Sequence, residues 1–311
     1  MDDPVGTPIR ELRGKLNVIS ALRCLSEYTF LKIVETGPVV MPQEDRSADS
    51  IELYQFGDSP CCMKVRMALA EKKLPWRERF IRSWQFDHHQ PDYLEINPHG
   101  TAPTLVHGGQ HITQSNVIIE YLDEAFPDPV RLKPSDPMQI ARMRQWMADE
   151  QDHLFKHIIV LSFNLMMKLR LEAFGLEQLT AWSKRIPDQV RAQDYLQRVT
   201  SPPNDTSINI AQENLRKHMK RLDQELEKSG GPWVCGETFT LADICLAPIF
   251  DRIEWLDLER IWEDLPKITE WYGRIQLRPC FIEGVHPFAY RMWGPRKSVE
   301  AHPFNDADYP T

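Results

Sequence analysis

The chain has 311 residues, a formal net charge of -8 and 42% hydrophobic residues. A chain of this length forms about two domains of roughly 100–200 residues each. Its acidic balance, with no run of Lys and Arg interleaved with aromatic residues, argues against nucleic acid as a partner.

The longest apolar runs, residues 158–161 and 244–250, are far shorter than the ~20 residues that span a bilayer, so we expect no membrane partner. Residues 1–23 mix acids with bases and do not resemble a secretory signal, so we expect a cytoplasmic protein. The six cysteines have neither disulfide-framework nor zinc-site spacing, and we expect no bound metal.

The first 50 residues differ from the rest, because residues 42–50 (PQEDRSADS) are polar and charged, as linkers are. We expect residues 1–50 to be a flexible extension. The pattern then becomes regular: a β-prone run at residues 51–56 is followed by turn residues 57–60 and apolar residues at helical spacing. A second strand is predicted at residues 76–81.

Residues 104–107 and 110–113 are predicted to form a hairpin across Gly108 and Gly109, and a helix is predicted at residues 116–126. This order predicts a small mixed sheet with helices, an α+β domain over residues 51–127. Residues 128–137 (DPVRLKPSDP) form the expected linker.

After the linker the strand signals stop, and residues 138–171 and 208–228 show long helical periodicity. The prediction is an all-α domain over residues 138–290, followed by a C-terminal tail at residues 291–311. Residues 182–204 are interrupted by prolines and polar residues, so we expect that segment to be partly irregular.

Ser59 and Pro60 stand where the first predicted helix begins, which suits an N-cap and the first helical position. Capping alone would explain both residues. A helix N-terminus also carries free N–H donors and about half a positive charge, which biases a nearby thiol toward the thiolate. A serine hydroxyl there adds one more donor.

Pro103 directly precedes a predicted strand, where an ordinary turn proline is the simple interpretation. Gln114 and Ser115 precede the helix at residues 116–126. The exposed N–H groups of such a helix start suit a carboxylate, although these residues could also be no more than a cap.

Three motifs occur in a fixed order: S-P-C-C-x-K-V-R-x-A-L-x-E-K from Ser59, N-P-x-G-x-A-P-T-L from Asn97, and T-Q-S-x-x-I-x-E-Y-L-D-E from Thr113. Together they resemble the amino-terminal domain of the cytosolic glutathione transferases. The segment from Gly236 to Ile244 resembles the family's capping-box motif, and Arg278-Pro279 its carboxy-terminal helical signature. The resemblance covers about residues 51–285.

The resemblance implies a thioredoxin-like domain of order βαβαββα followed by an all-α domain, with glutathione as co-substrate. It implies that Ser59 hydrogen-bonds the glutathione sulfur, that the backbone of Ala102 pairs with the cysteinyl unit, and that Pro103 is cis. Gln114 and Ser115 would bind the γ-glutamyl end. A homodimer is also implied.

His88 falls where theta-like members place a histidine near the glycyl carboxylate, with His89 adjacent; an idle, exposed His88 is the alternative. Many relatives have Glu at the position of Gln114, so the ion pair to the γ-glutamyl ammonium is lost, although zeta-like members also use Gln. Cys61 allows a competing interpretation, in which its thiolate forms a mixed disulfide with glutathione. Cys62 is expected to be a small buried residue.

Several residues of the helical region could line a pocket for an electrophile, although residues at helical spacing are more often core: Trp146, His153, His157, Phe163, Met166, Met167 and Trp182. The resemblance is to serine-type members, theta/zeta-like or bacterial β-etherase-like. It implies attack by a glutathione thiolate on a small-molecule electrophile, with aryl ethers or halides favoured. The alternatives are a Cys61-dependent thiol-transferase and a non-catalytic glutathione-binding protein.

Overall fold

The computed structural model describes residues 50–83, 86–171, 175–202, 204–285 and 287. The expected N-terminal extension, apart from Ser50, and the expected C-terminal tail lie outside the described residues. None of the helices in this part of the chain combines the length and apolar composition that crossing a bilayer requires.

A four-stranded mixed sheet has the order β2-β1-β3-β4. Its strands are β1 (Ile51–Gln55), β2 (Arg77–Phe80), β3 (Thr104–His107) and β4 (Gln110–Thr113). β1 pairs with β2 in parallel and with β3 antiparallel, and β3 and β4 form the predicted hairpin. Gly108 and Gly109 have φ angles of 55° and 74°, the left-handed conformations that a two-residue hairpin turn requires.

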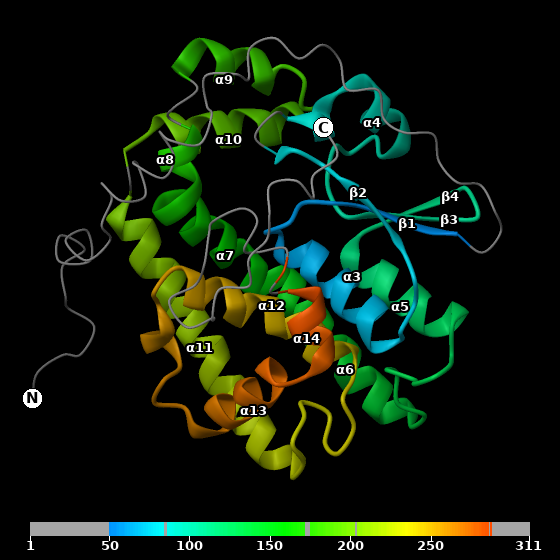
Figure 1. Cartoon of the computed structure of the whole chain (residues 1–311). Helices are drawn as coiled ribbons and strands as arrows, with labels where there is room; N and C mark the ends of the chain where they lie inside the picture. Colours follow the sequence, from blue (N-terminus) through cyan, green and yellow to red (C-terminus); the bar gives the residue numbers. More distant parts are fainter. Residues whose placement is uncertain (1–49, 84–85, 172–174, 203, 286, 288–311) are drawn as a thin grey trace, which may run out of the picture. The chain divides into compact units, whose positions relative to one another are not determined.

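Helices cover both faces of this sheet. Its helical elements are α3 (Pro60–Glu71), the short turn η3 (Asp87–His89), α4 (Pro91–Ile96) and α5 (Ser115–Ala125). Figure 1 shows α3 and α5 on the side of the sheet that faces α12 and α14, with α4 across the sheet. The predicted βαβαββα order is therefore confirmed.

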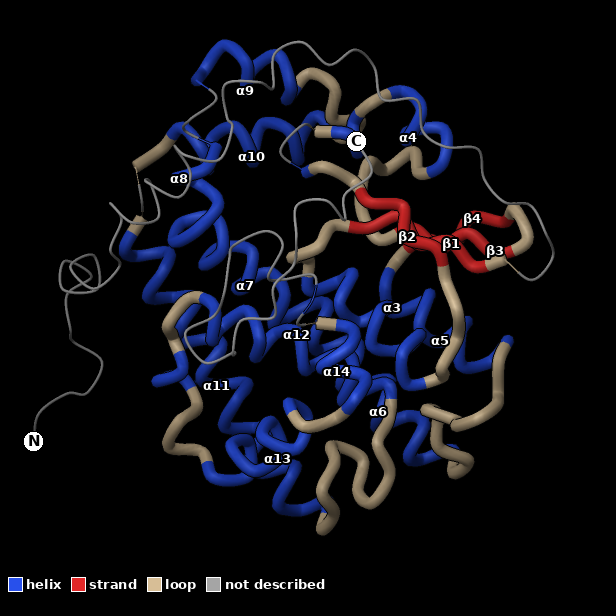
Figure 2. Tube along the Cα trace, viewed as in Figure 1, coloured by secondary structure: helices blue, strands red, loops and turns tan. Residues whose placement is uncertain are grey.

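The helices of the rest of the described chain are joined by loops, with one isolated bridge between Trp233 and Gly236, and Figure 2 shows no strand there. Its helices are α6 (Pro137–Asp149), α7 (Phe155–Ser162), α8 (Lys168–Leu171), α9 (Gly175–Ser183), α10 (Gln189–Thr200), α11 (Asp205–Ser229), α12 (Leu241–Trp255), α13 (Pro266–Gln276) and α14 (Pro279–Gly284), with a 3-10 turn η7 (Glu259–Ile261). The prediction of a helical second region is confirmed.

Two π-helical turns interrupt the helix predicted at residues 138–171. They are η4 (Glu150–Leu154), between α6 and α7, and η5 (Phe163–Met167), between α7 and α8. Each π turn changes the direction in which the following side chains point, and such turns are common at functional sites. Helical periodicity alone does not signal them.

The segment at residues 182–204 is partly irregular, as expected, and its middle part is the helix α10. Asp188 caps this helix: its Oδ1 accepts from the N–H groups of Val190 and Arg191 at 3.0 and 3.1 Å. The cap lies just after Pro187, so the proline ends one helix and the aspartate starts the next.

α12 is the central helix of the second region and is buried from Leu241 to Ile253. The predicted capping box starts it. The Asp243 carboxylate accepts from the Thr240 N–H at 2.9 Å, the Val234 N–H at 3.0 Å and Trp271 Nε1 at 2.8 Å. This buried carboxylate therefore joins the loop before α12 to α13.

Candidate functional site

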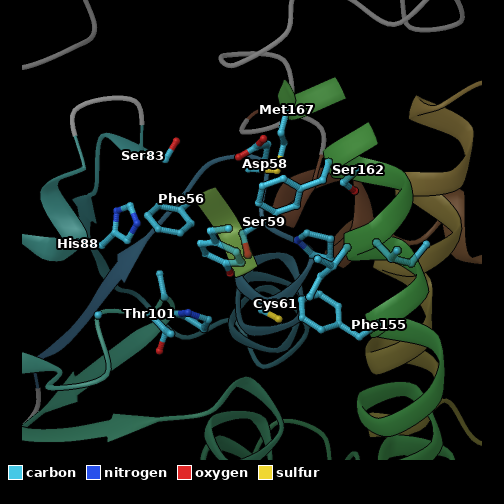
Figure 3. Close-up of a pocket in the computed structure, with 18 of the residues that line it drawn as sticks. Phe56, Asp58, Ser59, Cys61, Ser83, His88, Thr101, Phe155, Ser162 and Met167 are labelled. Carbon is cyan, nitrogen blue, oxygen red and sulfur yellow. The ribbon is translucent and has the colours of Figure 1, made fainter. Parts of the chain in front are cut away.

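A cavity of about 430 Å³ lies where the sheet region meets α7, η5 and α10. Its volume is within the range of small-molecule sites. The seven candidate residues of residues 51–127 all line it: Ser59, Cys61, His88, Ala102, Pro103, Gln114 and Ser115. In Figure 3, Ser59 lies between His88 and Phe56 on one side and Phe155 and Ser162 on the other.

The loop from β1 to Ser59 is held by two buried arginines. Arg66 of α3 donates to the carbonyl oxygens of Phe56 and Gly57 at 3.2 and 2.9 Å. Arg252 of α12 donates to the carbonyl oxygen of Asp58 and to Ser162 Oγ, the latter at 3.1 Å. Three successive carbonyl groups before Ser59 are thus fixed by guanidinium groups, one of which comes from the helical region.

Ser59 is the N-cap of α3, with Pro60 at the first helical position. Its Oγ accepts from the Cys62 N–H at 3.4 Å, which is long for a hydrogen bond of this type. The hydroxyl is half-buried and lines the cavity. It can therefore donate its hydrogen to a ligand atom while it still caps the helix.

Asn97 shapes the loop that leads to Pro103. The fully buried Asn97 side chain donates to the Thr101 carbonyl oxygen at 2.7 Å and to Thr104 Oγ1 at 3.0 Å. The Ala102–Pro103 peptide bond is cis. Ala102 and Pro103 line the cavity directly before β3.

Gln114 has a φ angle of 70°, in the left-handed region that non-glycine residues rarely adopt. Backbone strain of this kind costs of order 1–3 kcal/mol and is concentrated at functional sites. Gln114 is exposed at the cavity wall, and the buried Ser115 begins α5 beside it. The predicted anion-binding helix start therefore faces the same cavity as Ser59.

The two cysteines after Pro60 have different environments. Cys62 is fully buried, as predicted, and burial raises its pKa to about 12. Cys61 is half-buried at the cavity wall, and burial raises the pKa of its thiol too, although the Lys64 ammonium opposes this. Neither cysteine is held as a thiolate at neutral pH.

His88 and His89 both line the cavity, and His89 is buried with 2% exposure. Their rings are tilted by 49° to each other, with centroids 3.9 Å apart. Burial lowers the pKa of His89 to about 4 and holds that of His88 well below its usual value. The half-buried His88, packed edge-on against Phe56, is not the exposed histidine of the alternative interpretation.

Of the helical residues named as possible pocket residues, Phe163, Met167 and Trp182 line the cavity. The other four do not: Trp146, His153, His157 and Met166 are absent from its wall. Phe163 and Trp182 also belong to a buried apolar cluster, so they contribute to the core and to the cavity at once.

Sequence reasoning missed Arg191 and Arg252, which also line the cavity. The sequence does indicate Arg252, because this residue and Asp251 interrupt the mostly apolar sequence of α12. Arg191 had no such signal, because it lies on an amphipathic helix whose polar face also carries Asp194 and Arg198. Among the described residues, no three His, Cys, Asp or Glu side chains gather as metal ligands would.

Family comparisons match both regions of the fold. The model of the glutathione S-transferase N-terminal domain matches residues 53–130, and that of the C-terminal domain matches residues 175–274. The first match contains the sheet, Ser59, Ala102–Pro103 and Gln114–Ser115. The second contains Trp182, Arg191 and the capping box of α12.

Individual relatives agree with this assignment. Protein LigF of Sphingobium sp. is 26% identical, with 75% of this chain and 92% of LigF aligned. The crystal structure of the β-etherase LigF superimposes with a TM-score of 0.70 over 76% of this chain and 98% of that one, at 24% identity.

Two further relatives carry different descriptions. The FtsZ-localized protein A of Caulobacter vibrioides is 25% identical, with 83% of this chain and 97% of the relative aligned. The tetrachloro-p-hydroquinone reductive dehalogenase of Sphingobium chlorophenolicum is 23% identical, with 74% and 94% aligned. With both family models placed in order on the observed fold, the chain belongs to the glutathione S-transferase family.

Proposed function

We propose that this chain binds glutathione in the cavity and holds its thiol as a thiolate beside Ser59, for attack on an electrophilic carbon of a second substrate. The observation that carries the proposal is the position of the Ser59 hydroxyl, at the N-terminus of α3 and in the wall of the cavity. The domains assigned to the two substrates are residues 51–127 for glutathione and residues 138–290 for the electrophile.

The remaining cavity residues fit the three parts of glutathione. The backbone of Ala102, next to the cis peptide bond, would pair with the cysteinyl unit, and Gln114 and Ser115 would bind the γ-glutamyl group at the start of α5. His88 would lie near the glycyl carboxylate. This arrangement would put the sulfur at the N-terminus of α3.

The free energy needed to stabilise a thiolate is within the range that this site can supply. Lowering a thiol pKa from about 8.5 by two units takes ~2.7 kcal/mol of selective thiolate stabilisation. A helix N-terminus contributes roughly 0.3–1 kcal/mol, and a hydrogen bond to a charged group roughly 1.5–3 kcal/mol. Ser59 would supply that hydrogen bond.

In the reaction, the thiolate forms a carbon–sulfur bond while the leaving group departs with the electrons of the bond that breaks. We favour aryl ethers and aryl halides as substrates. Two observations support this: apolar side chains of α7, η5 and α9 line the cavity, and relatives are described as a β-etherase and a dehalogenase. The departing group would be a phenolate or a halide ion.

Turnover assays test the proposal with glutathione, one β-aryl ether and 1-chloro-2,4-dinitrobenzene. We expect Ser59→Ala to lower kcat/KM by about 10–100-fold, the worth of a hydrogen bond to a charged group, while Ser59→Thr retains most activity because it keeps the hydroxyl. If the wild type binds glutathione but turns over neither substrate, the chain is a non-catalytic binding protein. If Ser59→Ala matches the wild type, the proposed role of Ser59 is wrong.

A further inference from the structure

Ser162 carries a buried hydroxyl in an otherwise apolar part of the cavity wall. It is the last residue of α7, is 4% exposed and lines the cavity. Its neighbours in that wall, Ile158, Ile159 and Phe163, are apolar. The π turn η5 begins directly after Ser162, and such turns are common at functional sites. In these surroundings a hydrogen bond from the hydroxyl to a ligand is stronger than it is in water.

Among the described residues, the Ser162 hydroxyl has a partner for its oxygen but none for its hydrogen. Arg252 Nη1 donates to Ser162 Oγ at 3.1 Å, so the oxygen is the acceptor and its hydrogen points elsewhere. Hydroxyl side chains in helices often donate to the carbonyl oxygen four residues before them. Thr180 does so at 2.7 Å and Thr200 at 2.8 Å, but Ser162 does not. The hydrogen is therefore left for a ligand atom that accepts it.

Arg252 holds this hydroxyl close to Ser59 and brings a positive charge. The same guanidinium donates to the carbonyl oxygen of Asp58, the residue before Ser59. Figure 3 shows Asp58, Ser59 and Ser162 around the same part of the cavity, whose wall also includes the buried Arg252. A hydroxyl that accepts from a cation is a stronger donor, because the charge draws electron density from its oxygen.

We propose that Ser162, held by Arg252, donates a hydrogen bond to the ether oxygen of an aryl ether substrate and stabilises this oxygen as it leaves. The inference rests on the proposed function, which supplies the glutathione thiolate. As the carbon–sulfur bond forms, the carbon–oxygen bond breaks and its electron pair stays on the oxygen of a phenolate, which later takes a proton from water. Negative charge thus grows on the atom that the hydroxyl contacts, so the hydrogen bond strengthens in the transition state.

This role distinguishes between the two substrate classes of the proposed function. A departing chloride ion accepts a hydrogen bond more weakly than a phenolate oxygen does. A hydroxyl supported by a guanidinium therefore favours the cleavage of aryl ethers over that of aryl halides.

A series of aryl ethers tests this role through the leaving group. The substrates share one reacting carbon and differ in the phenol that departs, from 4-nitrophenol, a weak base that leaves readily, to 4-methoxyphenol, which leaves poorly. The proteins are the wild type, Ser162→Ala and Ser183→Ala. Ser183 is a matched control: it is the buried last residue of α9, its Oγ donates to the Thr180 carbonyl oxygen at 2.9 Å, and it is not in the cavity wall.

We expect Ser162→Ala to lower kcat/KM by about 10–100-fold for the 4-methoxyphenol ether and by less than about 5-fold for the 4-nitrophenol ether, because a weaker base needs less stabilisation. Ser183→Ala should match the wild type. A loss of equal size with every ether and with 1-chloro-2,4-dinitrobenzene would contradict the proposal. That result would mean that Ser162 acts only through Arg252 on the position of Ser59.

A second measurement does not depend on turnover. 4-Nitrophenol stands for the departing group, and its absorbance against pH gives its pKa when it is bound beside S-methylglutathione, which has no free thiol. We expect the bound phenol to titrate about one pH unit lower in the wild type than in Ser162→Ala.

Equal pKa values of the bound phenol in the two proteins would overturn the role of Ser162. The proposed function stands in that case if the wild type still conjugates glutathione. A phenol pKa that is lower in the wild type than in Ser162→Ala, in a wild type that converts no substrate, would overturn the proposed function and leave the hydrogen bond from Ser162 in place.

Discussion

At the residue scale, two candidate groups lie two positions apart at the start of α3, and their surroundings give them different chemistry. The Ser59 hydroxyl caps the helix through a long contact and lines the cavity. The Cys61 thiol lines the same cavity, but burial raises its pKa, and the Glu150 carboxylate adds to this effect. A thiol with a raised pKa is a poor nucleophile near pH 7.

This difference gives a prediction for the thiol-transferase alternative. Replacing Cys61 with Ala should leave glutathione conjugation within about 3-fold of the wild type, because the Cys61 thiol is protonated and a change of under 1 kcal/mol is expected when no charged group is lost. Reduction of a glutathione mixed disulfide, measured by coupled NADPH oxidation, should be slow in both proteins. Fast reduction in the wild type that disappears in Cys61→Ala would establish the cysteine mechanism instead.

At the element scale, buried hydrogen bonds from distant segments fix the elements that carry the site. Arg252 links α12 to the loop before Ser59, and Asp243 fixes the start of α12 itself. The position of Ser59 thus depends on a helix of the second region.

Replacing Asp243 with Ala should destabilise the protein by about 3 kcal/mol or more, because several buried donors lose their acceptor at once. The donors include the N–H groups of Val234 and Thr240 and the indole N–H of Trp271. Urea unfolding measures the loss. The exposed Glu237 lies in the same loop, and Glu237→Ala should change stability by less than about 0.5 kcal/mol. Equal effects of the two substitutions would contradict this role for Asp243.

Elements that depend on local sequence were predictable. The hairpin at Gly108 and Gly109, the cap at Ser59 and the capping box of α12 each follow from residues a few positions apart. The break suggested by Pro187 is present between α9 and α10, but the cap at Asp188, and with it the helix α10, was overlooked. The π turns η4 and η5 could not be predicted, since they insert one residue into a helix without changing its composition.

The motifs predicted the part of the site that the sheet region supplies, and of the helical residues named from the sequence only Phe163, Met167 and Trp182 line the cavity. The seven candidate residues between Ser59 and Ser115 all line the cavity, and the resemblance brought them together. Arg191 and Arg252 are far along the chain from the carbonyl groups to which they donate. The separation is 92 residues from Arg191 to His99 and 194 residues from Arg252 to Asp58. Contacts over such separations depend on how the helices pack, which periodicity does not determine.

At the scale of the whole described chain, a buried ion pair joins the sheet region to the helical region. Lys64 Nζ of α3 lies 2.5 Å from Glu150 Oε2 of η4, and both side chains are fully buried. Asn116 of α5 and Cys245 of α12 complete the network: Lys64 Nζ donates to Asn116 Oδ1 at 3.1 Å, and Cys245 Sγ lies 3.2 Å from Glu150 Oε2. Four elements thus meet around one pair of opposite charges.

Removing one charge of this pair should lower the free energy of unfolding more than removing both. Lys64→Met leaves Glu150 buried without compensation, which typically costs about 3–5 kcal/mol, and the double variant Lys64→Met/Glu150→Leu should recover part of that loss. Urea unfolding of the two single variants and the double variant measures the coupling. Lys267→Met is the control, because Lys267 forms a partly exposed pair with Glu270 at 3.8 Å and should lose under about 0.5 kcal/mol. Additive losses in the double variant would contradict the coupling.

Three expectations about the whole molecule stay predictions: the homodimer, the cytoplasmic location and the domain limits at residues 51–127 and 138–290. The family assignment rests on both regions of the fold. The role of Ser59 within it is the central claim of the proposed function.

The pKa of the thiol of bound glutathione tests that claim most directly, by thiolate absorbance against pH in the wild type and in Ser59→Ala. We expect the bound thiol of the wild type to titrate about one to two units below the free value of about 8.5, and that of Ser59→Ala to return toward the free value. Thiolate should therefore form at lower pH in the wild type than in the variant. An unshifted thiol in the wild type, or an equal shift in both proteins, would contradict the role of Ser59.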